Sequence, residues 1–367
     1  MIIIMLIFTT ALFFGSVGTP LARKLAIKSG FIALPKADRA HEEPTALMGG
    51  LAIYGAAIFT LLVILLGSPL IRNAYRISEF ASIIIAASLI AALGLWDDRR
   101  ALPPWAKLVG QLIPAVIVFM AGVRVSSLPL PIPDMWKTSL QFVITLAWIL
   151  YITNAINFLD NADGIAVMTS TTTSAIFLLI AILNGQQLVS ILAAAVLGAS
   201  LGFARYNLPL PKSTIFMGDS GSLFLGFLLA VLGIKIRIPG NVPEITWMVP
   251  IIVLALPIFD TALVYISRKR RHQSFFMGGV DHSTHRLSRY GLDKLSVALA
   301  VGLINGALGL IAIFITQASS SEAYVVAMSL VGIAFYALWR LEFKASFWFR
   351  TGKEPAQLTP VRIEGQG

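Results

Sequence analysis

The sequence predicts an all-α polytopic membrane protein with about eleven transmembrane helices. Hydrophobic residues make up 57% of the 367 residues and charged residues only 13%, whereas a soluble domain carries about 25% charged residues. The mean hydropathy is +0.82, and apolar stretches of roughly 17 or more residues, each long enough to cross a bilayer, recur along the chain. Backbone groups inside lipid must be hydrogen-bonded within their own segment, so these stretches are expected to be helices.

We place the eleven spans at residues 2–19, 48–66, 78–95, 108–121, 140–155, 165–183, 188–204, 217–235, 245–266, 295–316 and 323–339. The fourth and fifth are expected to run longer than these ranges. Residues 1–342 are expected to form one integral membrane domain, and residues 343–367 a cytoplasmic tail. The first span has neither a basic segment before it nor a small-residue cleavage site, so we expect an uncleaved helix.

The distribution of basic residues predicts the orientation. Alternate loops, together with the tail from Arg340, hold 22 of the 28 Lys and Arg residues, and the other loops hold 6. Cytoplasmic loops carry the excess of Lys and Arg, so the N-terminus is predicted outside and the C-terminus in the cytoplasm. The net charge of +10 is attributed to this bias, and no nucleic-acid partner is expected. The chain has no cysteine, which excludes disulfides and Cys-based zinc sites.

Six acidic residues fall at or inside predicted helix ends on the predicted cytoplasmic side. They are Asp97, Asp98, Asp160, Asp163, Asp219 and Asp260. Acids at membrane depth are costly and indicate function. The adjacent pair Asp97–Asp98 can share a metal or raise each other's pKa, so that one becomes a base. The alternative is an exposed helix end neutralised by Arg99 and Arg100.

Residues 154–166 concentrate amides and carboxylates between two apolar spans. Asn154, Asn157 and Asp160 are three residues apart and share a face if the fifth helix continues through them. Asp163 follows one turn later. Oxygen-rich side chains at this spacing suit Mg²⁺, which takes substrate phosphates as further ligands. The alternative is a set of polar caps around a loop.

Phe216–Ser222 reads FMGDSGS, with glycines on both sides of Asp219. Such glycines allow close approach of a ligand to the backbone, and amides at a helix start favour phosphate. The alternative is a simple helix start. Further along, His282 and His285 are three apart with Arg286 adjacent, a combination that suits phosphate oxygens. The Arg268–Arg271 run is interpreted as a topological stop signal.

Lys107 lies one turn before Gln111 at the start of the fourth span. A lysine there could reach a phosphate from the membrane surface. Snorkelling of its ammonium group to the interface is an equal alternative.

Together these motifs resemble the polyprenyl-phosphate N-acetylhexosamine-1-phosphate transferase superfamily. The likeness extends from His41 to Leu287 in the superfamily's order. It rests on HEEPTALMGG, on WDD with the downstream Lys107 and Gln111, on the N-x-x-N-x-x-D-x-x-D-G pattern from Asn154 to Gly164, on the segment from Gly202 through Asn207 to FMGDSGSLFLG, and on PIFDT with Asp260.

Two departures from the superfamily pattern stand out. Asn161 occupies a position where glycine is common, and the His-rich loop, often H-x-H-H, keeps only its first and last His in His282–His285. This loop is more similar to the branch that uses UDP-N-acetylglucosamine or a related N-acetylhexosamine than to the peptidoglycan branch.

The resemblance implies a reaction. A membrane-embedded polyprenyl phosphate attacks the sugar phosphate of a UDP-sugar, most simply UDP-GlcNAc, and UMP leaves. The product would initiate cell-envelope glycan synthesis at the inner membrane, with the active site on the cytoplasmic face. Mg²⁺, with Mn²⁺ as the alternative ion, and basic groups would offset the repulsion between two polyanions. A homodimer is among the expected assemblies.

The resemblance also implies residue roles. Asp219 and Asn157 would hold the metal, Asp97 and Asp98 would act on the lipid phosphate, and Asp160 would support the site. The expected donor-binding residues are Asp163 and Phe216 for uridine, and Lys107, Asn154, His282, His285 and Arg286 for the rest of the substrate. Two rival functions remain open from the sequence: a phospho-MurNAc-pentapeptide transferase and a multi-pass transporter. The one-sided placement of the acids and the absence of an evident internal repeat disfavour the transporter.

Overall fold

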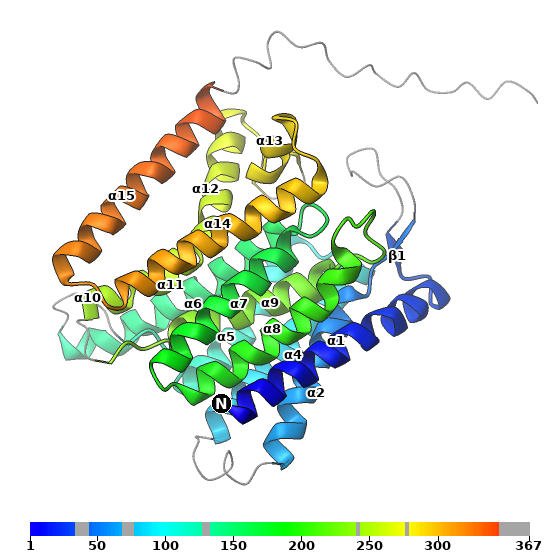
Figure 1. Cartoon of the computed structure of the whole chain (residues 1–367), viewed down its shortest axis with the longest axis horizontal. Helices are drawn as coiled ribbons and strands as arrows, with labels where there is room; N and C mark the ends of the chain where they lie inside the picture. Colours follow the sequence, from blue (N-terminus) through cyan, green and yellow to red (C-terminus); the bar gives the residue numbers. More distant parts are fainter. Residues whose placement is uncertain (34–43, 68–76, 127–132, 240–242, 276–278, 345–367) are drawn as a thin grey trace, which may run out of the picture.

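The computed structural model describes residues 1–33, 44–67, 77–126, 133–239, 243–275 and 279–344. These residues form a bundle of tilted helices (Figure 1). The helices are α1 (Ile2–Lys28), α2 (Gly49–Gly67), α4 (Ile77–Arg99), α5 (Pro104–Met120), α6 (Asp134–Leu159), α7 (Ile165–Leu183), α8 (Gln187–Asn207), α9 (Gly218–Lys235), α10 (Pro243–Thr246), α11 (Met248–Val253), α12 (Ala255–Arg270), α13 (Ser283–Arg289), α14 (Lys294–Ile315) and α15 (Ser320–Trp339), followed by the π-helical turn η1 (Arg340–Lys344).

Within the described residues, eight helical segments are long and apolar enough to cross a membrane, and α2 and α5 are shorter apolar helices. Each predicted span except 245–266 falls on one continuous helix. The helices α5 and α6 begin at Pro104 and Asp134, earlier than the ranges read from the sequence, as expected.

The prediction of one continuous helix over 245–266 was wrong. The chain there forms α10, α11 and α12, with breaks at Trp247 and Leu254. The physical reason for the break at Leu254 is the proline at position 257. Inside an uninterrupted helix it would lack the N–H donor for the carbonyl four residues earlier and its ring would clash there, whereas the first turn of a new helix tolerates it. Because of the break, α12 starts afresh and carries Asp260 in its second turn.

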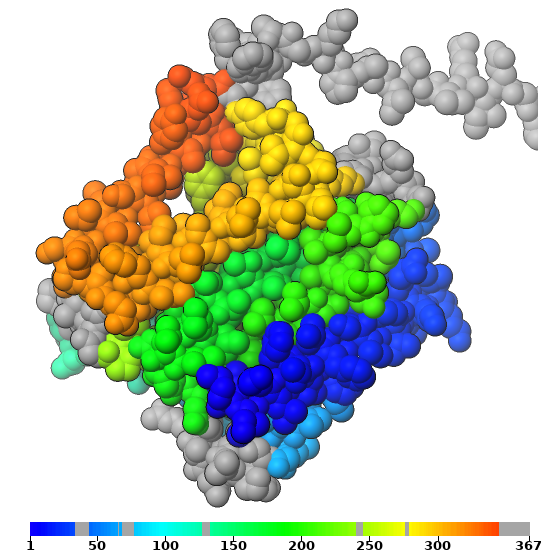
Figure 2. All heavy atoms as spheres, viewed as in Figure 1, coloured from blue at the N-terminus to red at the C-terminus, as the bar shows by residue number. Residues whose placement is uncertain are grey.

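The helix α9 lies at the centre of the bundle. It packs against α4 and α6 and also contacts α2, α7 and α8, while α1 covers α8 and α2. By contrast, Ala323 is the only buried residue of α15. Figure 2 shows α15 at the outside of the bundle. Its exposed side chains, among them Met328, Ile333 and Phe335, are those expected of a helix that faces lipid.

A two-stranded antiparallel sheet, the exception to the helical prediction, positions the start of α9. The strands β1 (Ile32–Ala33) and β2 (Thr45–Ala46) pair with each other, and Ala46 bridges to Ile215. The backbone then continues this contact, because the Gly49 and Gly50 amides donate to the Phe216 and Met217 carbonyls at 3.0 and 2.7 Å. Residues 44–50 and 215–217 therefore enter the bundle as one unit.

Candidate active site

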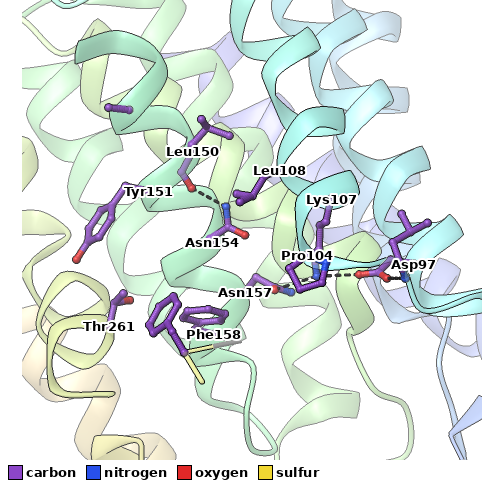
Figure 3. A pocket seen from close by; sticks show the side chains of 13 residues that line it. Asp97, Pro104, Lys107, Leu108, Leu150, Tyr151, Asn154, Asn157, Phe158 and Thr261 are labelled. Atoms are coloured by element: carbon purple, nitrogen blue, oxygen red, sulfur yellow. Dashed lines mark hydrogen bonds and ion pairs between the residues drawn. The ribbon is translucent and has the colours of Figure 1, made fainter. Parts of the chain in front are cut away.

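Four polar side chains from four helices meet at one end of the bundle. Lys107 at the start of α5 places its Nζ 2.8 Å from Asp97 Oδ2 on α4 and 2.8 Å from Asp219 Oδ2 on α9. It also donates to Asn157 Oδ1 on α6 at 3.2 Å. Figure 3 shows the side chains of Asp97, Lys107 and Asn157 meeting beside Pro104. We call Asp97, Lys107, Asn157 and Asp219 the carboxylate–lysine cluster.

The amides of this region are held in defined orientations. Asn157 Nδ2 donates to Asp219 Oδ1 at 2.7 Å and to Ser222 Oγ at 2.8 Å, which leaves its oxygen directed at Lys107. One turn earlier, Asn154 and Gln111 exchange two hydrogen bonds, of 2.6 and 3.3 Å. Asn154 thus lies beside the carboxylate–lysine cluster, and its hydrogen bonds to Gln111 hold α5 against α6.

Asp98 has a different position from its neighbour Asp97. Its two carboxylate oxygens accept the backbone amides of Asp219 at 2.7 Å and Ser220 at 3.0 Å. These are among the first N–H groups of α9, which have no partner within the helix, and a carboxylate there also suits the helix dipole. Gly218 has φ +72°, and a Cβ there would lie 2.7 Å from Asp98 Oδ2. Asp98 therefore docks α9 onto α4, and the glycine makes room for it.

Asp160 and Asp163 lie in the turn between α6 and α7. Burial, together with the charges of Asp219, Asp98 and Asp163, raises the pKa of Asp160 well above its usual value. Asp163 Oδ2 is 3.7 Å from Lys294 Nζ. The turn is anchored by the Gly164 amide, which donates to Asn207 Oδ1 at 3.1 Å. Asp160 therefore lies within electrostatic reach of Asp219 in the carboxylate–lysine cluster, and Asp163 within reach of Asp160.

A cavity of about 510 Å³ opens from the carboxylate–lysine cluster between α5, α6 and α12. Its polar end is formed by Asp97, Lys107, Asn154 and Asn157, and its apolar wall by residues that include Leu108, Ala147, Leu150 and Tyr151. Phe158 and Phe275 close one side, with ring centroids 5.0 Å apart in an edge-to-face arrangement. The cavity is thus amphipathic, ionic at one end and apolar along its length.

The predicted histidines form a second polar group on α12 and α13. The buried Asp260 carboxylate pairs with His282 Nδ1 at 2.7 Å and accepts the Ser283 amide and hydroxyl at 2.7 and 2.6 Å. The His285 ring lies 5.8 Å from that of His282, and its Nδ1 is buried with no hydrogen-bond partner in the described structure. Burial, with the nearby charges of His282 and Arg289, lowers the pKa of His285 to about 4.

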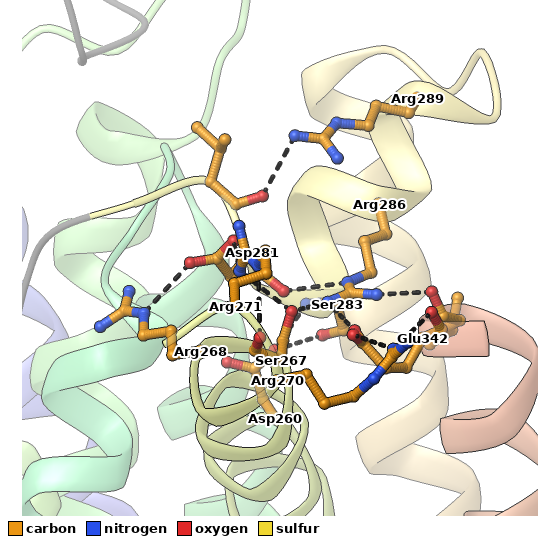
Figure 4. A network of polar contacts seen from close by, with 12 residues as sticks. Asp260, Ser267, Arg268, Arg270, Arg271, Asp281, Ser283, Arg286, Arg289 and Glu342 are labelled. Carbon is orange, nitrogen blue, oxygen red and sulfur yellow. Dashed lines mark hydrogen bonds and ion pairs between the residues drawn. The ribbon is translucent and has the colours of Figure 1, made fainter. Parts of the chain in front are cut away.

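Arg286 belongs to a structural network (Figure 4). It donates to the Asp281 carbonyl at 2.9 Å, to Ser267 Oγ at 2.9 Å and to Glu342 Oε2 at 2.8 Å. Asp281 in turn pairs with Arg268 and Arg271, which outweigh its burial and lower the pKa of Asp281. The basic run after α12 therefore packs against its own loop and against η1, and Arg286, with its partners there, does not line the cavity.

A side-chain hydrogen bond connects the second polar group to the turn after α6. Thr284 Oγ1 donates to Asn161 Oδ1 at 2.8 Å. These are the two positions at which the chain departs from the superfamily pattern, and the structure brings them into contact. Phe216, the remaining predicted residue, is half-buried at the base of α9, where its carbonyl accepts the Gly49 amide. His41 lies outside the described residues.

Sequence reasoning missed several residues of this region. Ser222 orients Asn157, and Phe158 lies at the cavity wall. Both belong to motifs that the sequence analysis recognised, so their closeness to Asp219 and Asn157 in the sequence could have indicated them. Asp281 directly precedes His282, and the sequence does not show that it pairs with Arg268 and Arg271. Nothing in the sequence connects Glu342 to Arg270 and Arg286, since the residues are 72 and 56 positions apart.

Comparisons with known proteins show which family the chain belongs to. The family model described as "Glycosyl transferase family 4" matches residues 80–237, which run from α4 to the end of α9. A "Probable undecaprenyl-phosphate N-acetylglucosaminyl 1-phosphate transferase" of Bacillus subtilis (strain 168) is 30% identical over 321 residues, 87% of each chain. The chain belongs to glycosyl transferase family 4. Its membership confirms the resemblance read from the motifs.

Two further members of the family cover similar lengths. An "Undecaprenyl-phosphate alpha-N-acetylglucosaminyl 1-phosphate transferase" of Yersinia pestis is 24% identical over 87% of this chain and 88% of its own. A "Phospho-N-acetylmuramoyl-pentapeptide-transferase" of Lactiplantibacillus plantarum is 27% identical over 76% of this chain and 88% of its own. Both branches considered from the sequence are therefore represented among the relatives.

Proposed function

We propose that this enzyme transfers N-acetylglucosamine 1-phosphate from UDP-GlcNAc to a polyprenyl phosphate, releasing UMP and forming polyprenyl-diphosphate-GlcNAc. The observation that carries the proposal is the amphipathic cavity, whose ionic end is the carboxylate–lysine cluster. Such a shape suits an amphiphile with one charged end. The relatives from Bacillus subtilis and Yersinia pestis, named for this transfer, support the same substrates.

The acceptor is assigned to the cavity. Its phosphate would lie near Lys107 and Asp97, and the first isoprene units would lie along the wall formed by α5 and α6, against Leu108, Leu150 and Tyr151. Asp97 borders the cavity, whereas both oxygens of Asp98 accept amides of α9. We therefore assign Asp97 as the base that takes a proton from the acceptor phosphate, or as the nucleophile that attacks the sugar phosphate of the donor as UMP leaves. Asp98 is assigned the task of positioning Asp219.

The donor set fits Mg²⁺ only as a shared site. In the described parts of the chain, no three His, Cys, Asp or Glu side chains are grouped to hold a metal by themselves. Asp219, with Asn157 and Asp97 beside it, offers two carboxylates and one amide oxygen, and Mg²⁺ is commonly bound by one or two carboxylates plus substrate phosphates and waters. When bound, the ion would offset the charge of the donor diphosphate and of the leaving UMP.

The remaining donor contacts are assigned from position. Asp163 and Phe216 would bind uridine, Asp160 would support the carboxylate–lysine cluster, and Asn154 would keep the cavity wall in place through Gln111. His282, whose Nδ1 is held by Asp260, presents its other nitrogen for a phosphate or sugar oxygen, with His285 beside it. The contacts of Arg286 give it a structural role in holding this loop.

We further propose eleven membrane crossings, with α10–α12 together making the ninth. The excess of Lys and Arg in alternate loops favours an extracytoplasmic N-terminus and a cytoplasmic C-terminus. This orientation would place the carboxylate–lysine cluster at the cytoplasmic face of the inner membrane, where nucleotide sugars are available.

The test is a side-by-side donor assay. Purified protein with Mg²⁺ and undecaprenyl phosphate should release UMP from UDP-GlcNAc, and much more slowly from UDP-MurNAc-pentapeptide. The reverse preference would assign the chain to the peptidoglycan branch, which the Lactiplantibacillus plantarum relative represents. No UMP from any UDP-hexosamine would refute the proposal.

A further inference from the structure

We propose that the ammonium group of Lys107 occupies the position that a divalent cation takes in the working enzyme and competes with it for the same oxygens. The metal is then bound tightly only together with the nucleotide diphosphate. This inference rests on the proposed function, because it concerns the cation assigned to that site.

The geometry places Lys107 at the focus of the oxygen donors. Its Nζ lies 2.8 Å from Asp97 Oδ2, 2.8 Å from Asp219 Oδ2 and 3.2 Å from Asn157 Oδ1. A lysine ammonium has three N–H donors and no acceptor, so these contacts use all three. Lys107 cannot bind a substrate phosphate in this state without releasing at least one of the oxygens.

The oxygens are held so that the position itself persists. Asn157 Nδ2 donates to Asp219 Oδ1 and Ser222 Oγ, which directs the amide oxygen inwards. Asp97 Oδ1 accepts the Leu102 amide at 2.7 Å, and α9 is docked on Asp98. The three donors therefore belong to a built framework around a cation, and they do not depend on Lys107 alone.

Burial makes the competition strong. The side chains of Lys107 and Asp97 are 16% and 8% exposed, while that of Asp219 is 33% exposed. Charges shielded from water interact more strongly than exposed ones, so a second cation beside the ammonium would be repelled. The more open Asp219 gives the side from which a metal can enter.

The diphosphate of the donor resolves this repulsion. Two carboxylates with one ammonium carry a net charge of −1, and a divalent ion added to them would make the group positive. Anionic diphosphate oxygens would give Lys107 a new partner as the metal takes over the carboxylates. Lys107 would thereby exchange a structural contact for a phosphate contact during donor binding.

The test measures metal binding without any transfer reaction. Mn²⁺ binding to the detergent-purified protein, followed by the electron paramagnetic resonance signal of the free ion, is compared for wild type and Lys107→Met. Removing the ammonium should tighten Mn²⁺ binding in the absence of nucleotide by roughly tenfold or more. Adding UDP should tighten binding to the wild type and change the variant much less.

Two variants serve as matched controls. Arg100→Gln removes a positive charge from an exposed side chain three residues from Asp97, and should leave Mn²⁺ affinity nearly unchanged. Lys107→Arg keeps the charge and should not tighten binding. If Lys107→Met does not fold, labelling of Lys107 in the wild type by an amine-reactive reagent, quantified by mass spectrometry, should rise when Mn²⁺ is added.

The outcomes separate this inference from the proposed function. Equal or weaker Mn²⁺ binding by Lys107→Met, or no rise in labelling of the wild type, would overturn the exchange while leaving metal-dependent UMP release intact. Absence of Mn²⁺ binding by wild type and variant, even with UDP, would overturn both the metal assignment and the exchange.

Discussion

Asp219 is the single residue on which most of the proposed chemistry depends. Its carboxylate contacts Lys107 and Asn157, and its backbone amide is held by Asp98. We predict that Asp219→Asn lowers the rate of UMP release by roughly a hundredfold or more, as expected when charge stabilisation in a closed site is removed. The unfolding temperature should change little, since asparagine keeps the shape and the backbone contact.

The matched control is Asp134→Asn, an exposed acid at the opposite end of α6. Its rate should equal that of the wild type. A wild-type rate in Asp219→Asn would remove this residue from the metal site.

His285 predicts a pH dependence of stability. Its pKa is lowered from 6.5 to about 4 in the folded protein, so between these values the unfolded chain binds a proton that the folded chain does not. Its contribution to stability is therefore complete above pH 6.5 and declines as the pH falls towards 4. We predict that the unfolding temperature falls more steeply between pH 7.5 and 5 in the wild type than in His285→Gln.

Thermal unfolding of both proteins over this range checks the prediction. Parallel curves would mean that His285 titrates normally in the folded state. Asp281, whose pKa is lowered by its two arginines, would lose its contribution only at more acidic pH, below the usual range of a carboxyl group, and so does not confuse the comparison.

At the scale of helices, the approach of α4 to α9 determines whether the acids meet. A Cβ on Gly94 would lie 2.4 Å from the Asp219 carbonyl oxygen, so a larger residue must push the two backbones apart. We predict that Gly94→Ala lowers the unfolding temperature and reduces UMP release at least roughly tenfold, because Asp97 and Asp98 are carried on the displaced helix.

Gly55→Ala is the matched control, since a Cβ at that helical position of α2 meets nothing within 4 Å. Alanine is also the better helix former, so this variant should be as stable as the wild type or slightly more so. Equal behaviour of the two variants would show that the close contact at Gly94 has no consequence.

At the scale of the whole molecule, η1 after α15 is attached to α12 and α13 through the buried carboxylate of Glu342 and the carbonyls of Leu341 and Glu342. Glu342 pairs with Arg270 and Arg286 at 2.6 and 2.8 Å and is itself buried. Glu342→Gln leaves two guanidinium groups short of a charged partner, and we predict a loss of about 1–3 kcal/mol of stability. Hydrogen exchange of the η1 amides should increase.

Glu322→Gln at the other end of α15 is the comparison. Glu322 is an exposed member of a capping box with Ser319, a role that glutamine also fills, so its replacement should cost well below 1 kcal/mol. A similar loss in both variants would indicate that α15 responds as a whole and that the buried pair is not special.

Features that depend on residues close together in the sequence were predicted, whereas contacts between distant residues were not. The length of the apolar stretches located the helices, because the backbone hydrogen bonds of each span lie within that span. The spacing of Asn154, Asn157 and Asp160 predicted one polar helix face. The break at Leu254 was not predicted, although Pro257 three residues later indicates the start of a new helix. The resemblance implies a substrate contact for Arg286, whereas its side chain is bonded to Ser267 and Glu342, 19 and 56 residues away in the chain.

Hydropathy and motif order were enough to identify a membrane-embedded member of this family and to single out its six acids, because they are local or additive properties of the sequence. The packing of the helices, in contrast, gives Asp97 and Asp98 different surroundings, because Asp97 borders the cavity and Asp98 docks α9. It also places Lys107 between two carboxylates. Adjacent side chains on a helix point in different directions, so what each one touches depends on the neighbouring helices.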